Sequence, residues 1–310
     1  MFNLEKSILQ PVKIQSLENR GVKLWIKRDD LIDDIVSGNK WRKLKFNVEL
    51  CQARKNEGVL TFGGAFSNHL IATASACNRV GLKSIGIVRG DELNPKSNET
   101  LLKCHELGMR LVFISREEYL MKNEKSYHDH LSQEYPNFFI VPEGGANYYG
   151  IIGCQEIIKE IKVPFSDVFV AQGTSATSCG IATCLSSEQR LHVVPALKGY
   201  DSIGEMKALY RKSGLEAEWI QHQLDKVIVH SNGHFGGYGK YTEELLNFIQ
   251  TFYSEHKIKL DPIYTGKVMF AMLKELEVLS YNGKSIIFVH TGGIQGSKSI
   301  IEKSGVDLYT

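Results

Sequence analysis

The sequence contains no apolar run long enough to cross a membrane. A helix that spans a bilayer needs about 20 consecutive apolar residues, and no segment of this 310-residue chain approaches that length. The segment from Met1 to Lys6 includes an acidic residue and lacks the apolar stretch of a secretion signal. The sequence therefore predicts neither a membrane protein nor a secreted one.

The chain also lacks an excess of charge of one sign. It has 37 lysine and arginine residues against 35 aspartate and glutamate residues, which leaves a net charge of +2. A strongly charged surface for nucleic acid or an anionic membrane is therefore not expected. The content of 43% hydrophobic and 23% charged residues is ordinary for a globular protein. The length allows one large domain or two closely packed domains with a substantial core.

The six cysteines contain no Cys-x-x-Cys pair. This spacing is typical of zinc ribbons and thioredoxin-like redox sites, so neither is expected, and we predict no metal site. Most of the cysteines fall on predicted helices among apolar residues, as small core residues do. Free thiols favour a reducing compartment, which predicts a cytoplasmic location. The six are Cys51, Cys77, Cys104, Cys154, Cys179 and Cys184.

What the chain does contain is an alternation of short apolar runs with longer amphipathic segments. This pattern predicts an α/β fold with parallel sheets flanked by helices. Right-handed crossovers would place the loops after the strands on one side, where ligands usually bind. We expect strands at 22–27, 59–62, 84–88, 110–114, 138–141, 167–170, 191–196, 226–229 and 285–290. We expect helices at 40–56, 68–80, 97–107, 149–161, 177–185, 203–213, 240–252 and 267–279.

A joint between two α/β blocks is predicted at residues 142–147, Pro-Glu-Gly-Gly-Ala-Asn. We expect a small domain over residues 45–144. A large domain would combine residues 1–44 with residues 145–310, because the N-terminal segment would return to pack with the second block. Lys40 would then serve a site between the two domains.

Lys40 follows Ser37-Gly38-Asn39 and lies just inside a predicted helix start. The positive end of the helix beside the amine would lower its pKa. An amine with a lowered pKa is suited to forming an imine with a carbonyl compound. A solvated surface lysine is the alternative that this segment alone leaves open.

The loop from Gly173 to Thr177 follows an apolar strand and opens a helix. Its small residues let the backbone approach a ligand, and its N–H groups suit an anion such as phosphate. An ordinary capped turn is the alternative. No Gly-Lys-Ser/Thr closes the loop, so it is not a nucleotide P-loop, and a Gly-x-Gly-x-x-Gly dinucleotide fingerprint is missing as well.

A second strand-to-helix turn contains Ser67, Asn68 and His69. Ser67 and Asn68 occupy cap positions, and with the free N–H groups they could hold a carboxylate, although ordinary capping explains them equally well. By itself, His69 is more typical of a surface or core histidine. Tyr238 and Tyr264 lie in loops and become functional candidates only if both reach one cavity.

Together these segments resemble the pyridoxal-phosphate (PLP) enzymes of the tryptophan-synthase-β type. More closely, they resemble the family of D-cysteine desulfhydrases and 1-aminocyclopropane-1-carboxylate (ACC) deaminases. The resemblance covers nearly the whole chain and implies a two-domain α/β fold of type II, with PLP between the domains, and a homodimer. It is carried, in chain order, by the segments 27–30, 37–40, 63–69, 142–145, 173–177, 261–267 and 290–293.

The resemblance also implies roles for individual residues. Lys40 would bind PLP and later move the substrate proton. The catalytic residues would be Lys40, Ser67, Tyr238 and Tyr264. The substrate carboxylate would be bound by Asn39, Ser67, Asn68 and His69. The cofactor would be bound by Lys40, Lys43, Asn68, Gly173, Thr174, Ser175, Ala176, Thr177, Tyr264, Thr265 and Thr291.

Thr265 and Thr291 bear on the substrate. By this resemblance, ACC deaminases carry Glu at the position of Thr265 and Leu at the position of Thr291. D-cysteine desulfhydrases carry small hydroxyl residues at both positions. The chain therefore favours α,β-elimination from D-cysteine, which gives pyruvate, ammonia and hydrogen sulfide. A carboxylate beside the pyridine nitrogen would strengthen the electron sink more than a neutral hydroxyl does.

Three alternatives stay open. One is ACC deamination to 2-oxobutanoate and ammonia, and another is elimination from a different small amino acid, such as D-serine or L-cysteine. The third is a non-catalytic protein that binds a phosphorylated ligand. Phe66 stands where relatives often carry Gln, which bears on the choice of substrate.

Overall fold

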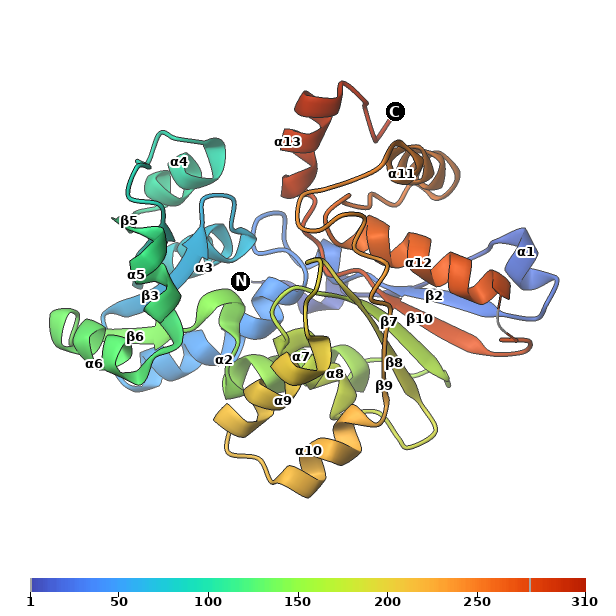
Figure 1. Ribbon diagram of the computed structural model, residues 1–310, viewed down its shortest axis with the longest axis horizontal. Helices are drawn as coiled ribbons and strands as arrows, with labels where there is room; N and C mark the ends of the chain where they lie inside the picture. The colour runs from blue at the N-terminus through green and yellow to red at the C-terminus, as the bar shows by residue number, and fades with distance from the viewer. Residues whose placement is uncertain (1, 279) are drawn as a thin grey trace.

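The computed structural model describes residues 2–278 and 280–310, and its strands form two sheets (Figure 1). The larger sheet consists of β1 (Leu9–Val12), β2 (Lys23–Lys27), β7 (Asp167–Gln172), β8 (Arg190–Pro195), β9 (Val227–Val229) and β10 (Ser285–Val289). Its strand order is β1-β2-β10-β7-β8-β9. The edge strand β1 is antiparallel to β2, and the other neighbours are parallel.

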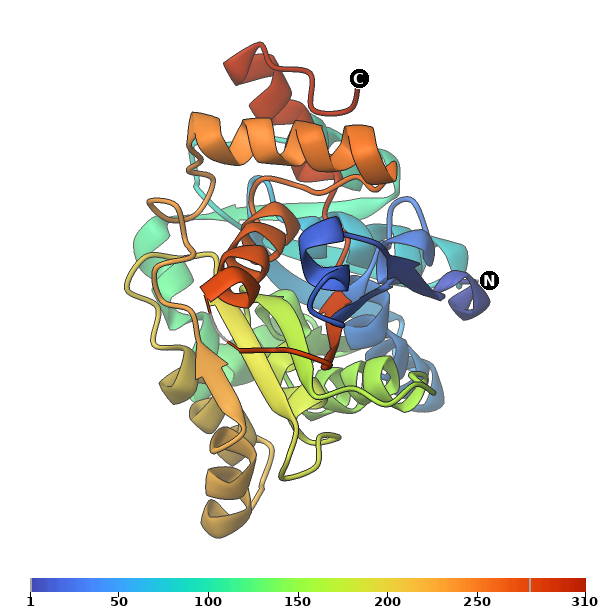
Figure 2. The ribbon, with the colours of Figure 1, turned by 90° about the vertical axis from the view of Figure 1, so that its right-hand side faces the viewer.

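Helices cover both faces of the larger sheet. Its strands carry apolar side chains on both sides, so both faces must be shielded from water. Phe169 and Ala171 belong to the core cluster under α11 (Glu243–His256) and α12 (Thr265–Val278). Their neighbours in β7 pack in a second cluster, against the helices of the other face. Figures 1 and 2 show these two layers. The helices of the other face are α7 (Tyr148–Lys159), α8 (Ala176–Ala182), α9 (Ser202–Lys212) and α10 (Ala217–Leu224).

The smaller sheet is parallel throughout and has the order β5-β4-β3-β6. One of its faces packs on Tyr119 and Leu131, and the other on Leu70 and Cys104. Its strands are β3 (Gly58–Gly64), β4 (Lys83–Arg89), β5 (Met109–Ile114) and β6 (Phe138–Val141). Its helices are α3 (Asn68–Arg79), α4 (Glu99–Glu106), α5 (Arg116–Leu120) and α6 (Lys125–Glu134).

Buried ion pairs fix the helix that carries Lys40. Arg42 is fully buried and bonds to Asp29 at 3.0 Å and to Glu160 at 2.5 Å. Although burial opposes its charge, these two carboxylates raise the pKa of Arg42. Gly153 of α7 lies so close that a Cβ atom there would fall 1.8 Å from the Arg42 carbonyl oxygen. The remaining helices are α1 (Gln15–Glu18), α2 (Asn39–Ala53) and α13 (Gln295–Ser304).

The predicted α/β architecture is confirmed, and each predicted strand has a counterpart within a few residues. The helix predicted from 240 begins at Glu243 instead, because the Thr242 hydroxyl caps it by accepting from the Leu245 N–H group at 3.2 Å. The predicted end of the last helix, Leu279, lies outside the described residues. The sequence patterns did not predict β1, α1, α5, α6, α10 or α13.

The four strands of the smaller sheet all lie between residues 58 and 141. The domain boundaries at 44/45 and 144/145 stay a prediction. Each helix within the described ranges is too short or too polar to span a bilayer. All six cysteines are free, and five of them are buried.

Candidate functional site

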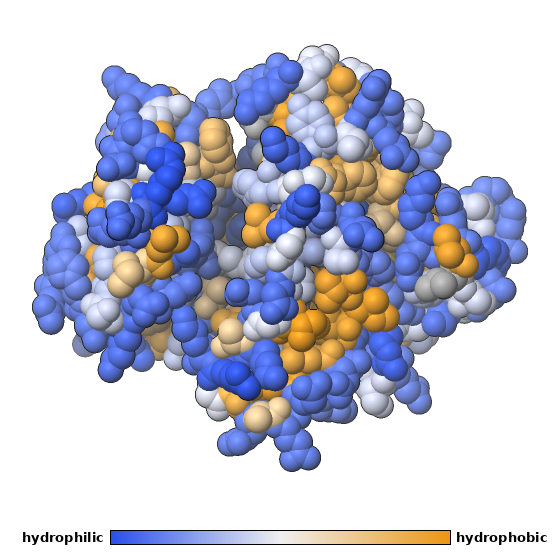
Figure 3. Space-filling model, in the orientation of Figure 1, coloured by the Kyte–Doolittle hydropathy of each residue, from blue (hydrophilic) through white to orange (hydrophobic). Residues whose placement is uncertain are grey.

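A cleft of about 1400 Å³ lies between the two sheets, where the loops after β3, β7 and β10 meet the start of α2. Figure 3 shows the surface hollowed between the lobe on the left and the rest of the molecule. Three predicted site residues, Ala176, Thr177 and Thr265, are buried and do not line this cleft. The predicted residues that do line it are Asn39, Lys40, Lys43, Ser67, Asn68, His69, Gly173, Thr174, Ser175, Tyr238, Tyr264 and Thr291.

The start of α2 depends on Gly38. This residue has φ +62°, a conformation that side chains other than glycine rarely adopt. A Cβ atom there would fall 1.9 Å from the carbonyl oxygen of Thr291. The same carbonyl accepts a 3.3 Å hydrogen bond from the Asn39 N–H group, so the first turn of α2 rests directly on the loop after β10.

Burial and, to a smaller extent, the charge of Lys43 together lower the pKa of Lys40 to about 7. The predicted contribution of the helix end stays a prediction, and Lys40 does lie in the first turn of α2. The Lys40 amine donates to Asn39 Oδ1 at 3.0 Å, and Asn39 Nδ2 donates in turn to Thr177 Oγ1 at 2.9 Å. Because a large share of the amine is neutral near pH 7, Lys40 can act as a nucleophile or as a base.

Lys43 supplies a positive charge beside the loop from Gly173 to Ser175. Its ammonium donates to Thr174 Oγ1 at 3.3 Å, and burial lowers its pKa. No carboxylate within the described ranges pairs with it. A Cβ atom at Gly173 would lie 3.3 Å from the Tyr264 ring, so the missing side chain opens this part of the cleft. A buried cation beside open backbone N–H groups fits an anion such as phosphate.

Ser67 caps α3 and keeps its hydroxyl proton available. Its oxygen accepts from the backbone N–H groups of His69 at 3.2 Å and Leu70 at 3.3 Å. Asn68 is the first residue of the helix, and both side chains reach the cleft. They can therefore donate to a ligand carboxylate, as the sequence predicts.

The hydrogen bonds of the His69 imidazole differ from those expected of a residue that binds a substrate carboxylate. The Thr61 hydroxyl donates to the carbonyl of Val141, so it must accept the 2.9 Å hydrogen bond from His69 Nε2. Burial, with the charges of Lys40 and Lys43, lowers the pKa of His69 to about 3. Its Nδ1 atom is then an unprotonated acceptor with no partner among the described residues. This nitrogen fits a ligand group that donates a hydrogen bond. A carboxylate can only accept one, so the geometry does not support the predicted contact between this imidazole and a carboxylate.

Tyr238 and Tyr264 both line the cleft, which meets the condition set by the sequence. Their ring centroids lie 6.1 Å apart at an interplanar angle of 70°. Burial raises the pKa of both phenols. The two hydroxyls also interact with each other, and both phenols stay protonated at neutral pH, so each has a proton to offer to the cleft.

Asp261 is a buried residue to which the sequence analysis gave no separate role. Its carboxylate accepts from the N–H groups of Ile263, Tyr264 and Thr265 at 2.7–2.9 Å. It also accepts from the Thr265 hydroxyl at 2.6 Å. Asp261 thus fixes Tyr264 and the start of α12. The sequence feature that could have revealed this role is the position of Asp261, four residues before the threonine that begins α12. An aspartate just before a helix commonly caps it.

Comparisons with known proteins identify the family of the chain. Residues 9–292 match the family model described as pyridoxal-phosphate dependent enzyme. The bifunctional D-cysteine desulfhydrase/1-aminocyclopropane-1-carboxylate deaminase, mitochondrial, of Arabidopsis thaliana is 31% identical over 299 residues, covering 89% of this chain and 73% of the relative. A putative 1-aminocyclopropane-1-carboxylate deaminase of Thermotoga maritima is 31% identical over 304 residues, covering 93% and 95%.

Two further similarities extend this result. The D-cysteine desulfhydrase of Yersinia pestis is 27% identical over 289 residues, covering 88% of this chain and 87% of the relative. A crystal structure of an ACC deaminase homologue superposes with a TM-score of 0.78 at 26% identity, covering 96% of this chain and 92% of that one. The similarity therefore includes both sheets and the cleft between them.

Proposed function

Because the chain belongs to the family of pyridoxal-phosphate-dependent enzymes, we propose that it catalyses α,β-elimination from D-cysteine, giving pyruvate, ammonia and hydrogen sulfide. The observation that carries the proposal is the Lys40 amine, whose pKa is lowered to about 7 in the cleft shared by the two sheets. The names of relatives support the reaction class, since they include D-cysteine desulfhydrase and ACC deaminase.

The residues of the cleft fit PLP. Lys40 would bind the cofactor covalently, and Lys43 would bind its phosphate together with the loop from Gly173 to Thr177. Lys43 lies beside that loop without a carboxylate partner within the described ranges, which supports the assignment. Asn68 would bond to the ring hydroxyl. When bound, PLP takes up the electron pair left at the substrate α-carbon. Tyr264 and Thr291, which line the cleft, would lie beside the ring, whereas Thr265 is buried and does not line the cleft.

Around the substrate, each residue has a separate task. The hydroxyl of Ser67 and the amides of Asn39 and Asn68 would bind the carboxylate and fix the orientation of the Cα–H bond. After its release from the cofactor by the substrate amine, the neutral Lys40 amine, held by Asn39, would accept the α-proton near pH 7. Tyr238, which lines the cleft beside Tyr264, would face the departing sulfur. The unsaturated amino acid that leaves takes up water and yields pyruvate and ammonia.

The choice of D-cysteine rests on Thr265 and Thr291, which are hydroxyl residues where ACC deaminases would carry Glu and Leu. One observation favours ACC as a second candidate substrate. The hydroxyl of Thr265 donates to the buried carboxylate of Asp261 at 2.6 Å, so a negative charge lies directly behind it. This charge can partly replace that of the glutamate.

A substrate panel tests the proposal. Purified holoenzyme is incubated with D-cysteine, L-cysteine, D-serine and ACC, and pyruvate, 2-oxobutanoate and sulfide are measured. We expect sulfide and pyruvate in equal amounts, with D-cysteine as the best substrate. Formation of 2-oxobutanoate from ACC as the dominant activity would replace the first candidate with the second. Inactivity of a PLP-loaded enzyme on all four would refute both.

We also propose a cytoplasmic location and a homodimer. The six free cysteines support a reducing compartment. The name of the Arabidopsis relative, which contains the word mitochondrial, provides an alternative compartment to test by fractionation. Light scattering on the holoenzyme measures the oligomeric state, and a mass of one chain would contradict the homodimer.

A further inference from the structure

We propose that His192, His230 and Glu275 bind a divalent transition-metal ion at a site separate from the PLP cleft. The three residues are far apart in the sequence, so no spacing pattern reveals them, and the sequence analysis predicted no metal site. None of them lines the cleft. They lie together beneath α12, on the face of the larger sheet that α11 and α12 cover.

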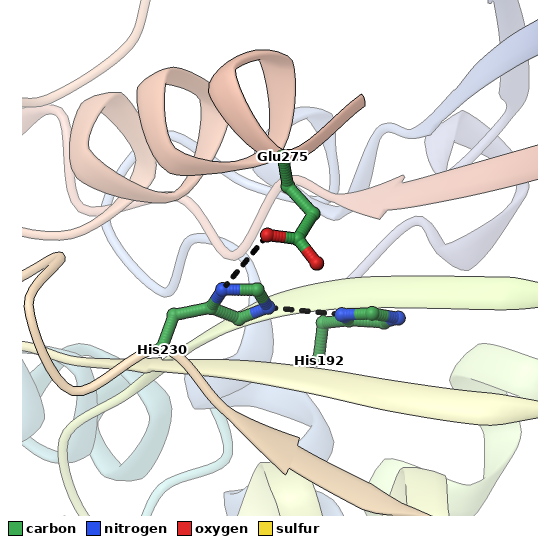
Figure 4. A group of neighbouring side chains, drawn as sticks. All are labelled: His192, His230 and Glu275. Carbon is green, nitrogen blue, oxygen red and sulfur yellow. Dashed lines mark hydrogen bonds and ion pairs between the residues drawn. The ribbon is translucent and has the colours of Figure 1, made fainter. Parts of the chain in front are cut away.

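Three different elements bring the donor atoms together. His192 is in β8, His230 follows β9 directly, and Glu275 is in α12 (Figure 4). One ligand atom from each residue lies within 4.8 Å of the others. The His192 side chain is fully buried, whereas the side chains of His230 and Glu275 are 14% and 24% exposed. An ion can therefore reach the cluster from solvent and meet two rigidly placed imidazoles.

The carboxylate of Asp167 orients the buried histidine. It accepts a 2.9 Å hydrogen bond from His192 Nε2, which leaves the lone pair of His192 on Nδ1, facing the cluster. Phe169 stacks on the same imidazole at a centroid distance of 4.0 Å and restricts its rotation. Metal-bound histidines in proteins are typically held in this way, by a carboxylate on the nitrogen that does not bind the metal.

The proton arrangement of the cluster also favours a cation. His192 Nδ1 and His230 Nε2 lie 2.9 Å apart, and with a neutral His192 imidazole it is His230 that donates to the lone pair of His192. The other nitrogen of His230, Nδ1, is then unprotonated and faces Glu275 Oε2 at 3.9 Å. A nitrogen lone pair and a carboxylate therefore face each other with no proton between them. This repulsion is relieved when Glu275 turns from His230 Nδ1 towards an ion bound at His230 Nε2.

Metal binding requires only a small rearrangement. The ion takes the place of the proton between His192 and His230, and that proton moves to Nδ1 of the partly exposed His230 or leaves to solvent. Zinc binds histidine nitrogen at about 2.0–2.1 Å in tetrahedral geometry, which places two such nitrogens about 3.3 Å apart. The observed 2.9 Å must therefore widen by a few tenths of an ångström. Rotation of the partly exposed Glu275 side chain brings in the third ligand.

The donor set indicates the class of ion. Two imidazoles and one carboxylate suit zinc, copper, nickel and cobalt, whereas magnesium and calcium prefer sites built entirely from oxygen. Three protein ligands leave the fourth position of a tetrahedral ion for water. A bound ion would join α12, which begins beside Tyr264, to the segment that leads from His230 to Tyr238. We therefore expect the ion to stabilise the folded holoenzyme.

Zinc binding to the holoenzyme tests the proposal. Zn²⁺ is titrated in competition with a chromophoric chelator, without thiols or substrate. We expect one equivalent to bind and to raise the melting temperature. His230→Ala should abolish this binding, and Glu275→Gln should weaken it at least tenfold. Asp167→Asn should weaken it about 10–100-fold, as the loss of an orienting carboxylate does. The matched control is Glu277→Gln on the exposed side of α12, which should bind like the wild type.

The variants are chosen to keep the protein folded. His230 and Glu275 are partly exposed, and melting without zinc, together with retained PLP absorbance, checks each variant. Wild-type affinity in both folded variants would overturn the proposal, as would the absence of stoichiometric binding to the wild type. Loss of zinc binding in Cys184→Ser, with binding retained in His230→Ala, would also overturn it, because the ion would then be held by the partly exposed thiol.

Discussion

The lowered pKa of Lys40 makes a quantitative prediction about how the apoenzyme takes up PLP. Only the neutral amine attacks an aldehyde, so the rate of covalent attachment should follow the neutral fraction of Lys40. At its ordinary pKa of 10.5, about 0.03% of the amine would be neutral at pH 7. At a pKa of about 7, roughly half is neutral, which is a gain of about a thousandfold.

The sign of the pH dependence follows directly. As the pH rises through about 7, Lys40 loses its proton, so the attachment rate should rise and then level off. A lysine of ordinary pKa would keep gaining rate up to about pH 10. The rate is measured by stopped-flow absorbance of PLP added to apoenzyme between pH 5.5 and 10.

The substitution Lys43→Met tests the cause. Burial is the larger contribution to the lowered pKa of Lys40, and the charge of Lys43 is the second. Removing that charge makes protonation of Lys40 easier, so the inflection should move to higher pH. Lys45→Met is the matched control, because Lys45 lies on the same helix and pairs with Glu156 at 2.6 Å. An inflection near pH 10 in the wild type, or an unchanged inflection in Lys43→Met, would refute the reasoning.

Three further substitutions test the framework of the site. Gly38→Ala places a Cβ atom 1.9 Å from a carbonyl oxygen at φ +62°, so bound PLP per chain, measured by absorbance, should fall sharply; full occupancy would contradict the predicted clash. Tyr238→Phe should lower kcat about 10²–10⁴-fold with PLP retained, as steady-state assays would show; an unchanged kcat would contradict a role for its hydroxyl beside the departing sulfur. Arg42→Met removes the ion-pair partner of the buried Asp29. It should reduce the free energy of unfolding, measured in urea titrations, by about 3–5 kcal/mol. A loss below about 1 kcal/mol would show that the Arg42–Asp29 pair is not needed for stability.

The sequence predicted the elements whose patterns are local. Alternating apolar runs located the buried parallel strands, and Gly38-Asn39-Lys40 correctly marked the start of α2. The edge strand β1 was not predicted, because its four residues include Pro11, which only an edge strand tolerates. Helices α5 and α6 lie in a polar segment where few apolar residues mark a buried face.

The electrostatics of the site could not be predicted from the sequence. The state of His69 depends on a hydrogen-bond chain through Thr61 and on the nearby amine of Lys40, and these contacts exist only in the folded chain. The cluster of His192, His230 and Glu275 likewise forms only when β8, the end of β9 and α12 pack together. Residues that act through long-range contacts leave no local pattern.

The central claim is that Lys40 is the residue that binds PLP. Borohydride reduction of the holoenzyme, followed by proteolysis and mass spectrometry, locates the attached cofactor on one peptide. We predict the reduced PLP adduct on Lys40 at close to one per chain, and no adduct in Lys40→Ala. An adduct on Lys43 or on another lysine, or an unlabelled Lys40 in an enzyme that retains its PLP, would contradict the claim.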